Sequence, residues 1–188
     1  MVARSLETIA AAWPELLGAA AALGVLVGAG QVARRMGVPG AITRSAVHLG
    51  TGLFVVALPA LFAHPAPVTA LAVLFVLANG LAWASGRLGA LHADRPESLG
   101  TVTFPLALAL TAPFFWTPER LGVLQTAFLV LAVADPLGSA VGRGAPARRR
   151  LALSSGSAKS WDGLAAVAVG AGVAGAAGHR AARGGHRR

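Results

Sequence analysis

Six apolar runs dominate this chain, and their length limits the folds that it can adopt. They cover about residues 8–30, 46–62, 67–85, 99–116, 121–141 and 161–178. A helix that crosses a bilayer needs about 20 predominantly apolar residues, and these runs reach or approach that length. Only 12% of the residues are charged, whereas average globular chains carry about 25%. The sequence therefore predicts an all-α, polytopic transmembrane helical bundle of about six spanning helices.

The length of 188 residues suits one compact bundle rather than several domains. We expect a single membrane-embedded domain over residues 1–178 and a basic tail over residues 179–188, whose composition is typical of disorder. No signal peptide is evident, because the first apolar run is longer than the hydrophobic part of such a peptide. Cysteine is absent, which excludes disulfides and thiolate metal sites.

The net charge is +9, and we attribute it to basic residues in loops, which commonly set membrane topology. No nucleic-acid-binding motif accompanies the charge, so no nucleic-acid partner is expected. The loops after the second and fourth runs contain a single cation, Arg120. The loops after the first, third and fifth runs contain ten, namely Arg34, Arg35, Arg44, Arg87, Arg95, Arg143, Arg148, Arg149, Arg150 and Lys159.

Loops rich in Lys and Arg remain in the cytoplasm, which predicts a multi-pass protein of the cell inner (plasma) membrane with these loops facing the cytoplasm. The four arginines after residue 178 conflict with six complete spans. Either the last run does not cross fully, or the chain ends where a longer relative would continue.

An acid and a proline interrupt the fifth run at Asp135 and Pro136. An ionisable side chain inside a hydrophobic segment is costly and marks a functional site by default. The proline predicts a break or kink in the helix, and backbone groups freed at membrane depth must face protein or a wet cavity. Because Mg²⁺ is commonly bound by one or two carboxylates together with substrate phosphates, Asp135 is a candidate metal ligand.

Glycines and cations follow this acid. Gly138 and Gly142 would let the backbone approach a nucleotide, although small-residue packing between helices explains the same spacing. Arg143 and Lys159 would offset negative charge that develops during phosphoryl transfer.

Two further polar residues are candidates elsewhere in the chain. His48 lies one helical turn after Arg44, so the pair shares a face, and His48 is a candidate base or phosphate ligand. The alternative is a topology-setting arginine beside an interfacial histidine. Asn79, inside the third run, needs a partner for its amide, and a bond between helices is favoured over ligand contact.

Four separated segments together resemble the dolichol kinase and phytol kinase family of CTP-dependent lipid-alcohol kinases. The segments are TRSAVHLGTG at 43–52, RPESLGTVTFPLAL at 95–108, ADPLGSAVGR at 134–143 and SAKSWDG at 157–163. They are similar to an Arg-Lys-x-x-His motif, a Gly-Thr-x-x-Phe-Pro segment, an Asp-x-x-Ala-x-x-x-Gly motif and a Lys-(Ser/Thr)-x-(Glu/Asp)-Gly motif. The resemblance covers about residues 40–175. Ser45 and Ser139 depart from the family's usual lysine and alanine, and relatives continue into further acid-bearing membrane helices.

The resemblance implies transfer of the γ-phosphate of CTP, or a related nucleotide, to the hydroxyl of a prenol-type membrane lipid, with Mg²⁺. Asp135, His48 and Lys159 would be catalytic, and Asp135 would bind the metal. The residues expected to bind nucleotide or phosphate are Arg44, Gly138, Gly142, Arg143, Asp162 and Gly163. Phosphatidate cytidylyltransferases, which also use CTP on membrane lipids, provide the alternative function. A non-catalytic membrane protein or transporter is the third interpretation.

Overall fold

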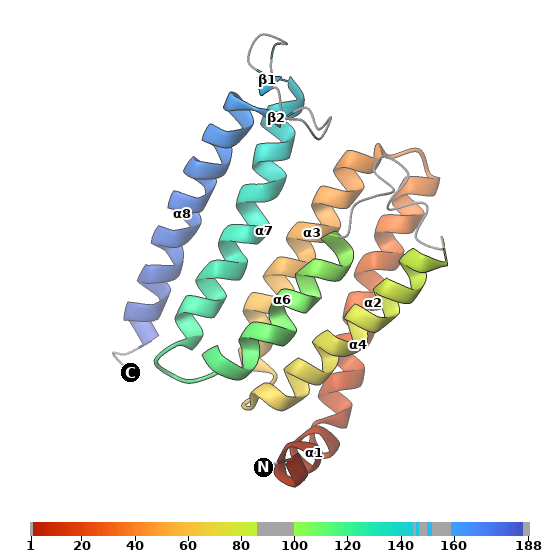
Figure 1. The fold of residues 1–188 in the computed structure, drawn as a ribbon, viewed down its shortest axis with the longest axis vertical. Helices are drawn as coiled ribbons and strands as arrows, with labels where there is room; N and C mark the ends of the chain where they lie inside the picture. Colours follow the sequence, from red (N-terminus) through yellow and green to blue (C-terminus); the bar gives the residue numbers. More distant parts are fainter. Residues whose placement is uncertain (1, 86–99, 145, 147–149, 152–158, 186–188) are drawn as a thin grey trace. The chain divides into compact units, whose positions relative to one another are not determined.

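The computed structural model describes residues 2–85, 100–144, 146, 150–151 and 159–185. These residues form an all-α structure, as the sequence predicts, apart from two paired two-residue strands (Figure 1). The helices are α1 (Val2–Ala11), α2 (Trp13–Arg35), α3 (Gly40–Ala57), η1 (Leu58–Ala60), α4 (Pro65–Ala84), α6 (Gly100–Phe115), α7 (Leu121–Gly144) and α8 (Trp161–Gly185), and the strands are β1 (Arg150–Leu151) and β2 (Lys159–Ser160).

Four helical segments are long and apolar enough to cross a membrane. They are α2, α3 with its extension to Ala60, α4 and α7. The apolar parts of α6 and α8 are shorter, at Gly100–Phe115 and Trp161–Ala176. The described helices are therefore consistent with the predicted integral membrane protein, and by length and composition four of them are candidate spans, so the predicted count of about six is not confirmed. Most side chains of the four segments are not buried within the protein, as expected of surfaces that lie against lipid.

The first apolar run is not one helix, contrary to the single span expected from residue 8. Helix α1 ends at Ala11 and α2 begins at Trp13, and Ala12 between them leaves the helical conformation with φ −95° and ψ 18°. Pro14 explains the break, because it lacks an N–H group and its ring would clash with the Ala10 carbonyl in a continuous helix. Proline is well accommodated in the first turn of a new helix, and α2 uses it there.

The break expected at Pro136 is absent, since α7 runs without interruption to Gly144. A proline removes one backbone hydrogen bond, here the one that the Ala132 carbonyl would accept. The flanking turns of α7 retain their own bonds, and neighbouring helices pack against this part of α7. The sequence predicts a break or kink at Pro136, and of these the break is absent.

Helix α8 continues beyond the predicted end of the last apolar run. It ends at Gly185, so part of the tail expected to be disordered is helical. Alanine and arginine are strong helix formers and are frequent after residue 178. The basic composition of this stretch does not prevent helix formation.

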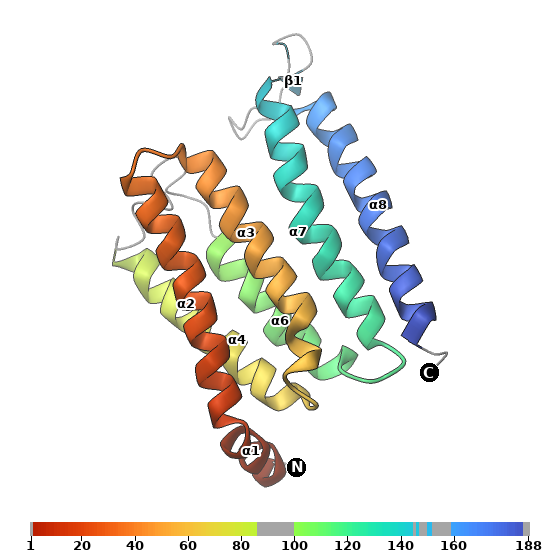
Figure 2. The same cartoon turned by 180° about the vertical axis from the view of Figure 1, so that it is seen from behind.

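The chain divides into two compact units, and each is described on its own. Unit 1 comprises Met1–Val47 and Ala57–Leu124. Its core lies where α4 packs along α6, with Val68, Leu71 and Leu108 among the buried side chains (Figure 2). The Asn79 Nδ2 donates a 2.9 Å hydrogen bond to the Thr101 carbonyl oxygen, which confirms the predicted bond between helices.

Unit 2 comprises His48–Val56 and Gln125–Arg188. It contains most of α7, α8 and the second half of α3. The Gln125 Nε2 donates a 2.8 Å hydrogen bond to the Val56 carbonyl oxygen, which joins the start of the α7 segment to the end of the α3 segment. Phe128, Ala132 and Ala134 of α7 are buried. Unit 2 holds most of the predicted site residues.

Candidate active site

Helix α7 is contacted on two of its sides within unit 2. On one side Gly52 of α3 lies so close to Ala132 that any side chain on the glycine would collide with it. On another side Gly138 lies against Gly163 and Val167 of α8. Both contacts depend on the absence of a side chain at a glycine. They fix which faces of α7 are covered and which face remains open.

Asp135 lies on the open surface of α7 between these two contacts. It follows Ala132 by three residues and precedes Gly138 by three, and an α-helix turns about 100° per residue. Asp135 is therefore directed about 60° from each contact. Its side chain is exposed, so the carboxylate can meet a ligand without displacing a neighbouring helix.

His48 reaches the same surface of α7 from α3. Its Nε2 lies 3.2 Å from the Leu131 carbonyl oxygen. A carbonyl oxygen only accepts hydrogen bonds, so Nε2 is the protonated nitrogen in this contact. Leu131 and Asp135 are four residues apart and therefore share a face of α7. The structure thus brings His48 and Asp135, which are far apart in the sequence, within about one helical turn of each other.

A polar stripe runs from Asp135 towards the end of α7. Asp135, Ser139 and Arg143 follow one another at four-residue spacing, and all three are exposed. The stripe spans about 12 Å, from a rise of 1.5 Å per residue. Arg143 lies in the last turn of α7, where the helix dipole favours a cation. An acid, a hydroxyl and a cation on one face can together contact a charged, extended ligand.

The start of α8 is held against α7 by a buried serine. Ser160 is 3% exposed, and its Oγ accepts a 3.0 Å hydrogen bond from the Gly163 backbone N–H. This is the arrangement of an N-terminal helix cap. Asp162 lies within the capped turn, and its Oδ2 atom is buried. The cap therefore determines where the second predicted carboxylate stands.

The three predicted glycines of the site meet in the contact between α7 and α8. A Cβ added to Gly163 would lie 2.9 Å from the Gly138 carbonyl oxygen and 3.2 Å from the Gly142 Cα. A Cβ added to Gly142 would lie 3.2 Å from the Ser160 Oγ. Close packing of helices, the alternative left open by the sequence, therefore accounts for these glycines. Their contact with a nucleotide stays a prediction.

Two other glycines were missed by the sequence analysis. A Cβ on Gly170 would lie 3.2 Å from the Ala134 Cα, and Gly52 contacts Ala132 as described above. Gly170 follows Gly163 by seven residues, or about two turns, so both lie on one face of α8. That spacing is visible in the sequence and was a usable signal. The Gly52 contact joins distant segments and leaves no local pattern.

Other predicted residues belong to unit 1 or lie outside the described part of the chain. Arg44 lies on α3 one turn before His48, but it belongs to unit 1. Lys159 lies on β2, and its side chain is outside the described part of the chain. The 95–99 part of the motif at 95–108 and the arginines at 148 and 149 also lie outside the described residues.

The described residues contain no group of three or more His, Cys, Asp or Glu side chains that could hold a metal by themselves. Asp162 adjoins Gly163, which packs at the level of Gly138 and Gly142, so it lies further along α7 than Asp135. An exposed single carboxylate nevertheless fits Mg²⁺, provided that substrate phosphates supply further oxygen ligands. The arrangement therefore fits a metal that arrives with a nucleotide better than a resident ion.

Comparison with protein-family models, with curated proteins and with solved structures yields no match.

Proposed function

We propose that this chain is a membrane-embedded lipid-alcohol kinase that transfers the γ-phosphate of CTP, or a related nucleotide, to the hydroxyl of a prenol-type lipid. In this proposal the shorter apolar helices α6 and α8 also cross the membrane, giving six spans. The cation-rich loops and the end of α7 face the cytoplasm of the cell's plasma membrane, where nucleotide is available.

The observation that carries the proposal is the contact of His48 with the Leu131 carbonyl oxygen, one helical turn before Asp135 on α7. In metal-assisted phosphoryl transfer a carboxylate can hold Mg²⁺ and an imidazole can accept a proton. They come from two segments with separate family-like motifs, and the hydrogen bond between His48 and Leu131 joins these segments. Packing alone does not require an exposed acid beside that bond.

The proposed reaction is a direct displacement at phosphorus. The oxygen of the lipid hydroxyl forms a bond to the γ-phosphorus, the bond from that phosphorus to the bridging oxygen breaks, and CDP leaves. The proton of the hydroxyl passes to the imidazole of His48. Asp135 would hold Mg²⁺, which when bound neutralises phosphate charge.

The remaining candidate residues act on charge and position. Arg143 ends the polar stripe of α7 and would neutralise phosphate oxygens, with Lys159 and Arg44 as further cations. The nucleotide would lie at the start of α8, near Asp162 and the contact formed by Gly138, Gly142 and Gly163.

The lipid substrate is proposed to approach from the bilayer. Leu131 lies one turn before Asp135 on the same face of α7, and its side chain is 41% exposed. An exposed apolar side chain next to an exposed carboxylate suits a ligand with a long apolar tail and one polar end. The tail would remain between helices, while the hydroxyl reaches the end of α7 that carries the polar stripe.

The test uses the purified full chain in nanodiscs with Mg²⁺ and CTP labelled on either the α- or the γ-phosphate. Acceptors are a series of prenols, diacylglycerol and phosphatidate. Transfer of γ-label to an alcohol, lost in the Asp135→Asn variant, is the expected result. Transfer of α-label to phosphatidate would instead establish the cytidylyltransferase alternative. No transfer to any acceptor would contradict both enzymes and favour a transporter or non-catalytic membrane protein.

A further inference from the structure

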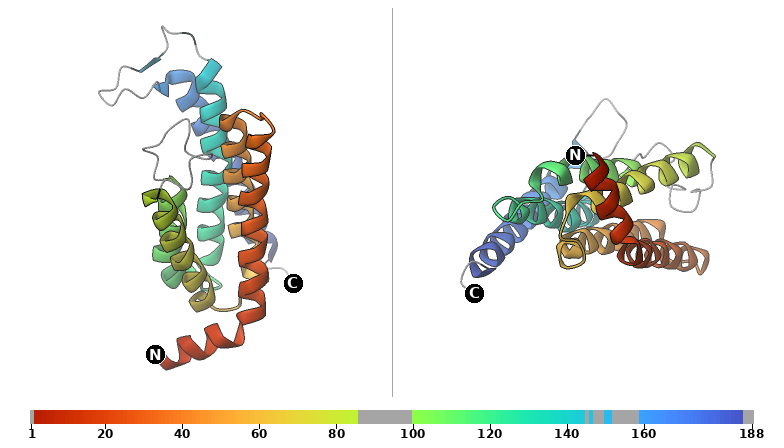
Figure 3. Two further views of the ribbon diagram at one scale, coloured as in Figure 1. Left: turned by 90° about the vertical axis from the view of Figure 1, so that its right-hand side faces the viewer. Right: turned by 90° about the horizontal axis from the view of Figure 1, so that it is seen from below.

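Helix α1 is a separate, amphipathic helix set across the end of α2. Figure 3 shows α1 leaving the end of α2 sideways rather than continuing along its axis. The break at Ala12 and Pro14 fixes this change of direction. Since α2 is long and apolar enough to span a membrane, the break lies at or near a membrane boundary. The end of α1 that adjoins α2 would therefore lie at the level of the lipid headgroups.

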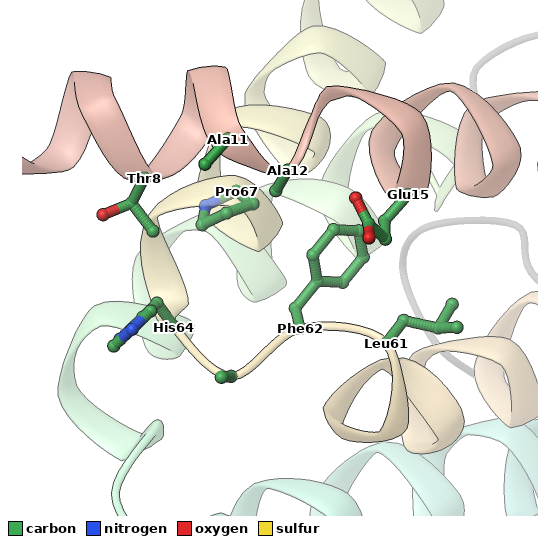
Figure 4. Close-up of a pocket in the computed structure, with 9 residues that line it drawn as sticks. Thr8, Ala11, Ala12, Glu15, Leu61, Phe62, His64 and Pro67 are labelled. Atoms are coloured by element: carbon green, nitrogen blue, oxygen red, sulfur yellow. The ribbon is translucent and has the colours of Figure 1, made fainter.

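Only one side of α1 is used by the rest of unit 1. Thr8, Ala11 and Ala12 line a pocket of about 210 Å³, with Glu15 of α2 and the 61–67 segment on its other sides (Figure 4). The Thr8 hydroxyl donates a 2.7 Å hydrogen bond to the Arg4 carbonyl oxygen within the helix. Helix α1 contacts α4, and the pocket residues on this side of α1 are small or polar.

The large apolar side chains of α1 are not used in that pocket. Leu6 and Ile9 are three residues apart and share a face, whereas Arg4 lies about 160° around the axis from Leu6. Leu6 is 62% exposed, and Trp13 at the start of α2 is 61% exposed. Leu17 lies one turn after Trp13 and is also 61% exposed. Ile9 is half-buried, so the apolar surface that the described residues leave uncovered is formed mainly by Leu6, Trp13 and Leu17.

We propose that α1 is an interfacial helix, with Leu6 and Ile9 inserted at the boundary between lipid headgroups and acyl chains. An amphipathic helix of this kind lies in the plane of the interface with its apolar face about 5–10 Å below the headgroups. Trp13 and Leu17, which follow in the first turns of α2, are exposed as well, and the exposed side of a spanning helix faces lipid. Trp13 is of the type that marks membrane boundaries. The partner is therefore the lipid surface itself.

The charges on α1 indicate whether its insertion depends on anionic lipids. Arg4 and Glu7 carry opposite charges on the polar side of the helix, so they give no net attraction to anionic headgroups. Apolar burial is then the driving force, and each anionic lipid adds little. Insertion of α1 is expected to be the same in zwitterionic and in anionic membranes and to resist added salt. This inference stands apart from the proposed kinase activity.

The absence of cysteine allows a direct test with single spin labels. Leu6→Cys and Arg4→Cys place labels on opposite sides of α1, and Val25→Cys, 72% exposed on α2, gives a reference inside the bilayer. The full chain is reconstituted into phosphatidylcholine vesicles with and without anionic phosphatidylglycerol. The Leu6 label should collide more with oxygen than with a water-soluble nickel chelate, and the Arg4 label should do the reverse.

Two results would overturn the proposal. Equal nickel accessibility of both labels would place α1 in water. Protection of the Leu6 label from both reagents would show that protein, such as a second copy of this chain, covers the face. The same signals in both lipid mixtures are expected, and a signal that requires anionic lipid would contradict the charge argument.

Discussion

The Nε2 of His48 lies 3.2 Å from the Leu131 carbonyl oxygen, one helical turn before Asp135 on the same helix. His48 therefore has two possible tasks, a structural bond between α3 and α7 and proton transfer in the proposed reaction. The two tasks make different demands on the side chain. The structural bond needs only an N–H donor, whereas proton transfer needs a titratable ring.

We expect His48→Gln, whose amide still offers an N–H donor, to preserve the fold and to reduce lipid phosphorylation about 100-fold or more, since general bases contribute about 10²–10⁴. His48→Ala should lose both tasks and lower the unfolding free energy by about 1 kcal/mol. Thermal unfolding in detergent and γ-label transfer measure the two effects separately. Full activity of the glutamine variant would exclude His48 as the base.

Asp135→Asn should abolish Mg²⁺-dependent transfer and leave stability unchanged. The substitution preserves shape, and the exposed carboxylate supports no helix contact among the described residues. Because one carboxylate needs phosphate oxygens to complete a magnesium site, Mg²⁺ should bind the wild type appreciably only when CTP is present. Titration calorimetry with and without CTP checks this dependence.

Glu7→Gln serves as the control for Asp135→Asn, since Glu7 is an exposed acid of α1 that lies outside the proposed site. Its metal affinity should fall less than that of Asp135→Asn. Tight binding of Mg²⁺ without nucleotide would show a resident metal site and contradict the assignment of Asp135 as the single protein ligand.

Larger side chains in the glycine contact between α7 and α8 should destabilise unit 2. Gly163→Val would force its side chain against the Gly138 carbonyl oxygen and the Ser160 Oγ, both within 3.2 Å of an added Cβ. Overpacking of this kind costs about 1–3 kcal/mol. Gly172→Val is the control, because a Cβ there meets nothing within 4 Å. Unfolding midpoints in detergent should fall for the first variant and change little for the second.

Local sequence patterns predicted a helical membrane protein. They did not predict the features that depend on contacts between helices. Runs of apolar residues located most helices, because length and composition act along the chain. A break or kink was predicted at Pro136, and α7 continues through it. The first apolar run was predicted as one span and instead divides into α1 and α2 at Ala12.

The site shows the same division between local and distant causes. Asp135 was recognised because an ionisable side chain within an apolar run is energetically unfavourable. Its proximity to His48 depends on Gly52 and Ala132, whose contact joins segments that no local pattern relates. The glycines at 138 and 142 were compatible with nucleotide binding or helix packing, and only the position of Gly163 shows the packing.

Ser160 offers a final test of how the start of α8 is positioned. Ser160→Ala removes the oxygen that accepts the Gly163 N–H and leaves that donor buried, so we expect a loss of about 1 kcal/mol in unfolding free energy. Ser160→Asp is a good capping residue by type, but its larger side chain must fit a site that is 3% exposed and lies against Gly142. Ser160→Asp should therefore be no more stable than Ser160→Ala. Loss of protection of the Gly163 amide in Ser160→Ala, measured by hydrogen exchange, would place the effect at the cap. Wild-type stability of a Ser160→Asp, Gly163→Val double variant would contradict the close contact described for α7 and α8.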